Sequence, residues 1–232
     1  GLAHAQANAQ AAPPTAGSLP PVTVSASGLQ LGANDMTTPT AVLEGDELVR
    51  RREATLGETL GSEPGITSSH FGAGASRPII RGMDGPRVRV LSDGAELHDA
   101  STISPDHAVV TEPLLAERVE VLRGPAALVH GGAVGGVVNV VDQKIPTALP
   151  ENGLEGTAEL RWGSAANGRA GVVGLTAGKG PLALRVEGAS RRAGDYRVGS
   201  GWAGGRKVDG SFNETDTGSI GLSWIGSAGY LG

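Results

Sequence analysis

The sequence predicts a compact α+β domain followed by antiparallel β-strands of an incomplete transmembrane β-barrel. Residues 119–141 indicate a strand, a tight turn, a short helical turn, a glycine-rich crossover and a second strand. After a proline-containing linker at 142–151, the pattern changes to alternating apolar and polar residues. Residues 1–35 have no helical or strand period and are rich in Ala, Pro, Ser and Gly, as in a flexible arm. We therefore expect an arm at 1–35, an α+β domain at 36–147 and barrel strands at 153–232.

The composition excludes several classes of protein. The 232-residue chain has a net charge of −5, which argues against a general nucleic-acid binder. Its 38 glycines are not periodic, so a collagen-like chain is excluded. No apolar run is long enough for a membrane-spanning helix, although barrel strands give a much weaker signal than such helices. The absence of cysteine is compatible with an exported bacterial protein.

The sequence contains no recognisable catalytic motif. A G-x-S-x-G nucleophile elbow, a cysteine nucleophile and an H-E-x-x-H metal motif are all missing. We therefore expect a protein that is not an enzyme and that requires no cofactor.

Two features of the arm stand out. Ala3-His4-Ala5 resembles the end of a cleaved secretory signal peptide, whose remnant would then open the chain. Within residues 19–26, Pro20 and Pro21 favour an extended backbone, and Val22-Thr23-Val24 has high strand propensity. Such a segment can add as an edge strand to a partner's sheet. An ordinary linker with a few valines would have the same sequence pattern and is the alternative.

The α+β domain is expected to contain short elements separated by clear turn signals. Thr55-Leu56-Gly57-Glu58 is a capping-box pattern that starts a short helix. Asp93-Gly94 is a hairpin signal. The remaining expected elements are a strand at 41–43, a polar helix at 45–52, strands within 76–82 and 87–91, and a short helix at 113–118.

The segment from Val119 to Val141 is the most informative part of the domain. Val119 to Leu122 and Val137 to Val141 are β-branched and apolar, as in buried strands. Pro125 can open a short helix, and the glycines at 131–136 allow close backbone approach. A phosphate-binding loop is the alternative, but the segment lacks both G-x-G-x-x-G and a following Lys-Ser/Thr.

Residues after 153 alternate between two faces. Leu154, Gly156, Ala158, Leu160 and Trp162 share one parity, and polar residues occupy the other. The segments around 182–187 and 219–224 repeat the alternation, whereas 169–177 alternates less cleanly. Strands of a transmembrane barrel have one face toward lipid and one toward water, so this alternation suits a barrel. The strands of a soluble β-sandwich alternate with the same period of two residues and are the alternative. Tight turns at 178–181 and 226–229 contrast with a long glycine-rich loop expected at 189–216.

Two stretches resemble the plug domain of TonB-dependent outer-membrane receptors: VEVLRGPAALVHGG with its continuation GGVVNVV, and SRPIIRGMDGPRVRVLSDG. The resemblance implies a plug that faces the periplasm, inside a barrel of about 22 strands in the outer membrane of a Gram-negative cell. This chain would then hold the plug and only about four strands with the start of a fifth, and its partners would be TonB and outer-membrane lipid.

The resemblance also implies roles for particular residues. The extended segment of the arm would be the TonB box. Arg81 and Arg123, which follow the strands of the two similar stretches, would pair with carboxylates of the barrel wall; solvated arginines are the alternative. The residues expected to bind TonB are Pro21, Val22, Thr23, Val24 and Ser25.

A block rich in histidine and aspartate lies between residues 98 and 107. His98, Asp99, Asp106 and His107 are ligand types that suit Zn²⁺, but their spacing is not a standard zinc motif, and a polar loop is the alternative. DASTISPDHAVVTEPLLAERVEVLRGPA is similar to the zinc-uptake (ZnuD-like) receptors, in which an Asp-His pair of the plug binds zinc. Asp106 and His107 match that pair, and His98 and Asp99 are weaker candidates.

The sequence therefore favours a receptor fragment for energised uptake, with Zn²⁺ as the transported ligand. A siderophore or haem receptor is the alternative within transport. A soluble periplasmic binding or signalling module is the alternative outside it.

Overall fold

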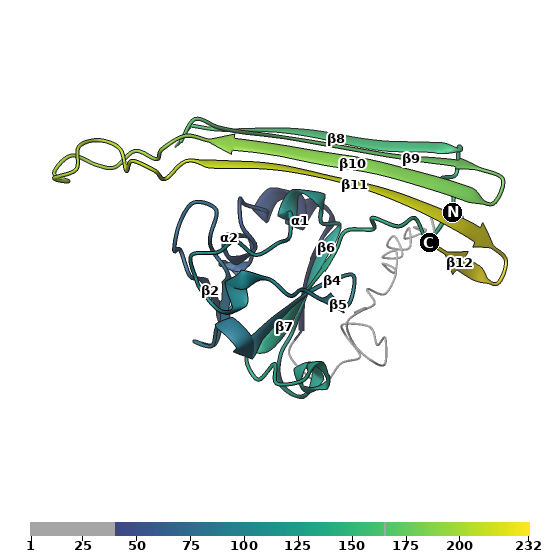
Figure 1. Cartoon of the computed structure of the whole chain (residues 1–232), viewed down its shortest axis with the longest axis horizontal. Coiled ribbons are helices and arrows are strands. Elements are labelled where there is room, and N and C mark those ends of the chain that lie inside the picture. The colour runs from purple at the N-terminus through teal and green to yellow at the C-terminus, as the bar shows by residue number, and fades with distance from the viewer. Residues whose placement is uncertain (1–39, 165) are drawn as a thin grey trace, which may run out of the picture.

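The computed structural model describes residues 40–164 and 166–232, which form a globular plug region and a sheet of long strands. We call residues 40–141 the plug region and strands β8 to β12 the wall sheet. In Figure 1 the wall sheet runs along one side of the plug region. The arm at 1–35, with its expected TonB box, lies outside the described residues.

The plug region is built on a five-stranded sheet with the order β1-β6-β7-β4-β5. Strand β6 pairs antiparallel with both β1 and β7, whereas β7 pairs parallel with β4. The two valine-rich strands around Gly124-Pro125 therefore lie side by side, as the sequence predicts. The strands are β1 (Thr40–Glu44), β4 (Val88–Ser92), β5 (Ala95–Glu96), β6 (Arg118–Leu122) and β7 (Gly136–Val141).

Helices and a small hairpin surround this sheet. The helices are α1 (Gly45–Arg51), α2 (Leu56–Leu60) and the 3₁₀ helices η1 (Gly85–Arg87), η2 (Ala100–Thr102), η3 (Pro113–Leu115) and η4 (Gly124–His130). Strands β2 (Ile66–Ser68) and β3 (Pro78–Ile80) form a separate two-stranded sheet. The helix expected at 113–118 is shorter than predicted, because Arg118 already belongs to β6.

Both faces of the central sheet are covered, which explains why β6 and β7 are rich in valine. The polar residues buried between them, Glu120 and Asn139, are joined by a hydrogen bond of 2.9 Å from Asn139 Nδ2 to Glu120 Oε2. Val119 and Val121 of β6 pack in a cluster with Leu48 of α1 and Leu56 of α2. Leu122, on the opposite face, packs with residues of η4 and the following glycine-rich turn. The plug region thus has a two-sided core.

One turn and one helix cap predicted from the sequence form as expected. Asp93 and Gly94 have φ values of 49° and 81° and connect β4 to β5, as a two-residue hairpin turn with positive φ at both positions requires. The Thr55 side chain accepts a hydrogen bond from the Glu58 N–H at 3.3 Å and so caps α2.

The wall sheet is an antiparallel meander with the order β12-β11-β10-β9-β8. The linker expected at 142–151 separates it from β7. Its strands are β8 (Leu154–Gly163), β9 (Gly168–Lys179), β10 (Leu182–Ala193), β11 (Asn213–Gly226) and β12 (Gly229–Leu231). The four long strands and the start of a fifth match the predicted number.

The bounds predicted for the long loop are wrong at both ends. Strand β10 continues to Ala193 and β11 begins at Asn213, so the loop comprises residues 194–212 rather than 189–216. Residues 189–193 and 213–217 pair with each other in register, and this pairing compensates for their weak apolar alternation. In Figure 1 the loop extends beyond the plug region at the end of the sheet opposite β12.

Candidate functional site

Asp106 and His107 form a contact at the surface of the plug region. His107 Nδ1 lies 3.0 Å from Asp106 Oδ1, and both side chains are about half exposed, at 54% and 51%. The Ser104 hydroxyl also donates to Asp106 Oδ1. These hydrogen bonds, first from Ser104 and then with His107, lower the pKa of Asp106, so its carboxylate is charged at neutral pH.

The two weaker metal candidates are placed differently. Asp99 caps η2: its Oδ1 accepts from Ser101 N at 2.9 Å, and its Oδ2 accepts from Val110 N at 3.0 Å. Both carboxylate oxygens of Asp99 therefore hold the loop together. His98 is exposed, and within residues 40–164 and 166–232 no three His, Asp or Glu side chains come together in a way that could hold a metal ion.

The Asp106 side of the plug region borders a hollow of about 450 Å³. The other side of this hollow is formed by the loop between β10 and β11. Phe71, Tyr196 and Phe212 contribute aromatic rings, and Asp106 and Asp209 contribute carboxylates. None of the described residues that line the hollow is basic. The hollow thus combines negative charge with apolar surface, which suits a cation or a cationic complex.

The wall sheet has two chemically distinct faces. Leu160 and Trp162 of β8 are 90% and 78% exposed and point away from the plug region. Glu159 and Arg161, of the opposite parity, contact the plug region instead. On β10, Glu187 is buried and is bound by Arg185 at 3.0 Å and by Ser219 of β11 at 2.9 Å. The alternation predicted from the sequence is therefore confirmed as an apolar outer face and a polar inner face.

Two groups of polar contacts join the plug region to the wall sheet. In the first, Arg52 of the plug region pairs with Glu159 of β8, which also pairs with Arg161. In the second, Arg191 of β10 lies 3.0 Å from Glu112, and the same carboxylate oxygen accepts from Leu114 N at 3.1 Å. The sequence did not single out these residues, although the polar parity of β8 indicated that Glu159 and Arg161 would face inwards.

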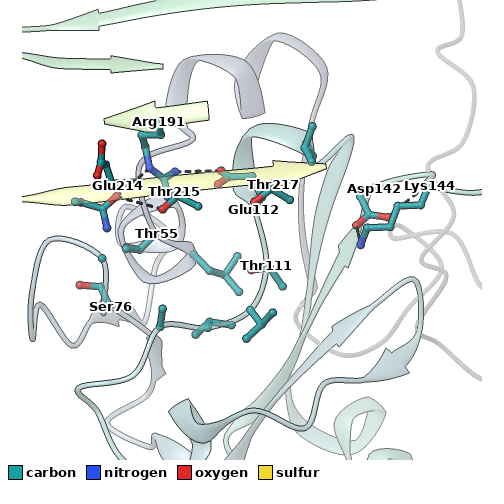
Figure 2. Close-up of a pocket in the computed structure, with 18 residues that line it drawn as sticks. Thr55, Ser76, Thr111, Glu112, Asp142, Lys144, Arg191, Glu214, Thr215 and Thr217 are labelled. Atoms are coloured by element: carbon teal, nitrogen blue, oxygen red, sulfur yellow. Dashed lines mark hydrogen bonds and ion pairs between the residues drawn. The ribbon is translucent and has the colours of Figure 1, made fainter. Parts of the chain in front are cut away.

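A cavity of about 460 Å³ lies beside the second group of contacts. Figure 2 shows Thr215 and Thr217 of β11 close to the Arg191–Glu112 pair, and the Asp142–Lys144 pair at the other side. The labelled side chains carry hydroxyls or charged groups, and apolar residues such as Leu56, Val109 and Leu115 complete the lining.

The structure brings Arg81 and Arg123 together within the plug region. A Cβ built at Gly65 would lie 3.9 Å from Arg123 Nη1 and 3.9 Å from Arg81 Cγ. Arg123 donates to the Pro64 carbonyl at 2.9 Å. Pairing of these arginines with carboxylates of the wall stays a prediction.

No helix formed by the described residues has the length and apolar character needed to cross a lipid bilayer.

Comparison with known proteins accounts for this architecture. Residues 33–137 match the family model described as TonB-dependent Receptor Plug Domain. The fold is therefore a plug domain followed by antiparallel strands that correspond to the N-terminal part of TonB-dependent receptor barrels, and the barrel is not closed by the strands described.

Solved structures of three receptors and transporters share this fold. The ferric enterobactin receptor PfeA of Pseudomonas aeruginosa has a TM-score of 0.59 at 21% identity, over 82% of this chain and 31% of that one. The siderophore receptor PirA of Acinetobacter baumannii gives 0.60 at 21%, over 81% and 29%. The copper transporter OprC gives 0.63 at 23%, over 80% and 28%. The chain thus spans less than a third of the length of each.

Proposed function

We propose that this chain is the N-terminal part of a TonB-dependent outer-membrane receptor for energised uptake, and that zinc is its substrate. The observation that carries the receptor proposal is the wall sheet with its two faces. A plug domain bound to the polar face of a sheet whose outer face is apolar needs a lipid surround. A soluble binding or signalling module would leave Leu160 and Trp162 in water.

In this proposal the plug faces the periplasm, and TonB engages the extended segment from Pro21 to Ser25. Traction on that segment would rearrange the plug region and admit substrate. The match of residues 33–137 to the plug family supports this assignment.

The zinc proposal rests on Asp106 and His107. An ionised carboxylate beside an imidazole supplies two ligand types suited to Zn²⁺, which usually takes four ligands. The remaining ligands must come from elsewhere in the receptor. The acidic hollow next to Asp106 supports a cationic substrate over an anionic one.

Uptake of a ferric siderophore or of copper is the second candidate. It is supported by the similarity of the fold to ferric-siderophore receptors and to a copper transporter. A haem receptor remains the further alternative from the sequence. In a siderophore or haem receptor Asp106 and His107 would not contact the substrate.

The deciding experiment measures uptake of radioactive zinc by Gram-negative cells that produce the complete receptor. We expect that zinc uptake requires TonB and that it is lower in an Asp106→Ala/His107→Ala variant. The Asp209→Asn variant tests the contribution of the hollow separately. Unlabelled Zn²⁺, copper and ferric enterobactin are added as competitors. Equal zinc uptake by the wild type and the double variant would reject the zinc site, and TonB-independent uptake would reject the receptor proposal.

A further inference from the structure

Helix α1 ends against a side chain of the wall sheet. Arg161 Nη1 donates to the Arg52 carbonyl at 2.6 Å, and Arg161 Nη2 donates to the Val49 carbonyl. Val49 lies in the last turn of α1, and Arg52 is the residue that closes it. One guanidinium group of β8 therefore binds two carbonyls at the C-terminal end of a plug helix.

These carbonyls need partners from outside the helix. The last four carbonyls of any α-helix lack intrahelical N–H donors, and a cation placed there also meets the negative end of the helix dipole. Arg52 N closes the last turn by donating to the Leu48 carbonyl at 2.8 Å. The Val49 and Arg52 carbonyls are left to Arg161, whose planar fork can reach both.

Helix α1 makes few other stabilising contacts. It contains seven residues, of which only Leu48 is buried, and its N-cap residue Glu44 makes no side-chain capping hydrogen bond. Helices of this length do not persist without tertiary contacts. Its internal Arg51–Glu47 pair, at 2.8 Å, is an exposed contact of small effect. Arg51 also pairs with Glu63 at 2.6 Å and donates to the Ser62 hydroxyl at 2.6 Å, which ties the helix to the segment after α2.

The residue after α1 is fixed from both sides. Arg52 Nη1 donates to the Leu114 carbonyl at 2.9 Å and to the Ala116 carbonyl at 3.4 Å, within the plug region. Arg52 Nη2 pairs with Glu159, which also holds Arg161 in place. Arg52, Glu159 and Arg161 thus form one continuous clamp between the plug region and β8.

We propose that the wall sheet completes helix α1, with Arg161 as a C-terminal cap that Glu159 positions. Helix α1 then loses part of its stability whenever the plug region is not docked on β8. Strand β1, which precedes α1 directly, lies at the end of its sheet among residues 40–164 and 166–232 and pairs there with β6. Undocking from β8 would loosen α1 and β1 together, ahead of the rest of the plug region.

Hydrogen–deuterium exchange of the protein purified in detergent tests this inference independently of any transport. In Arg161→Ala, amides of residues 45–52 should exchange about tenfold faster, a size expected for loss of a favourable helix-end interaction. Amides of α2 and β6 should keep their wild-type rates. Arg161→Lys keeps the charge but loses the fork, so it should restore only part of the protection.

Two further variants keep the proposal falsifiable if Arg161→Ala folds poorly. Glu159→Gln preserves side-chain volume and should accelerate the same amides by freeing both arginines. Arg192→Ala is the matched control, because the pairs that Arg192 makes are with exposed Glu214 and Asp216 of β11. Unchanged exchange in residues 45–52 of Arg161→Ala and Glu159→Gln, or equal acceleration throughout the plug region, would overturn the cap.

Discussion

At the scale of single residues, close backbone approach decides where the plug sheet can form. Gly136 opens β7 with a φ of 148°, and a Cβ there would lie 2.8 Å from Ile80 Cδ1 and 2.9 Å from the Leu122 carbonyl oxygen. The chain can therefore turn from the glycine-rich crossover into β7 only if this residue has no side chain. The same glycine brings β7 against the end of β6.

Replacing Gly136 by alanine should lower the free energy of unfolding of the plug region by about 2 kcal/mol, through backbone strain and overpacking. Chemical denaturation in detergent, with plug-region amides followed by hydrogen exchange, measures the change. Gly72→Ala is the control, because a Cβ at Gly72 meets nothing within 4 Å. A Gly136→Ala protein as stable as Gly72→Ala would contradict the packing argument.

A carboxyl pair makes part of the plug stability depend on pH. Burial, followed by a hydrogen bond with Asp142, raises the pKa of Asp93 from 3.8 to about 6. Since the folded pKa is the higher one, the stabilisation by the bound proton is fully present below about pH 3.8 and is lost as pH rises through about 6. Because Asp93 is only partly withdrawn from solvent, solvent screening limits the effect.

We therefore expect the wild type to lose more plug stability between pH 5 and pH 7.5 than Asp93→Asn does, by about 1 kcal/mol or less. Denaturant midpoints at the two pH values measure this difference. Identical pH dependence in both proteins would mean that Asp93 and Asp142 do not share a proton.

At the scale of secondary-structure elements, local signals determined most of what the sequence could predict. The capping box at Thr55, the Asp93-Gly94 hairpin and the β6–turn–β7 unit each depend on residues close together in the chain, and all three are confirmed. The parallel pairing of β4 with β7 was not predicted, because it joins residues 88–92 to 136–140 and leaves no local signal.

The same limit applies to the candidate site. The adjacency of Asp106 and His107 follows from their order in the chain, but the sequence could not place Asp209 and Tyr196 on the same hollow. Arg52 and Glu159 are 107 residues apart and lie in unrelated patterns, so no spacing rule identifies their contact. The alternation along β8 predicted that the Glu159 side chain points inwards, but it could not predict that Arg52 is its partner.

Helix α2 provides a test at this scale. The Thr55 hydroxyl accepts from Glu58 N at 3.3 Å and donates to Glu58 Oε2 at 3.0 Å. Thr55→Ala should destabilise the plug region by about 1 kcal/mol, whereas Thr55→Ser should retain most of the stability. Thermal denaturation of the three proteins measures both changes, and equal losses in the two variants would point to lost packing rather than a lost cap.

At the scale of the whole molecule, one sheet separates two environments. Ile220 of β11 is 74% exposed on the outer face, whereas Thr217 lines the cavity between the wall sheet and the plug region. Hydrogen bonds and ion pairs such as Arg191–Glu112 cross only the inner face. The plug region and the wall sheet therefore meet through polar groups and through one small apolar cluster, formed by Leu114, Leu115 and Ala189. They can separate without exposing a large apolar core.

If the outer face contacts lipid, Ile220→Arg should reduce folding into bilayers by about 2 kcal/mol, because a charge near the bilayer centre is costly. Thr217→Arg, which faces the cavity, should have a much smaller effect. Folded fractions in lipid vesicles, read from heat-dependent gel mobility of the complete receptor, compare the two. A larger penalty for Thr217→Arg would reverse the assignment of the faces.

The docking of the plug region on strands that follow it directly in the chain has a consequence for biogenesis. A polypeptide delivered from its N-terminus presents residues 40–141 first and β8 to β11 immediately afterwards. The arginine and glutamate contacts between them can therefore form early, without waiting for any other part of the molecule. We expect the plug region to act as a template on which strands β8 to β11 acquire their curvature and register during assembly.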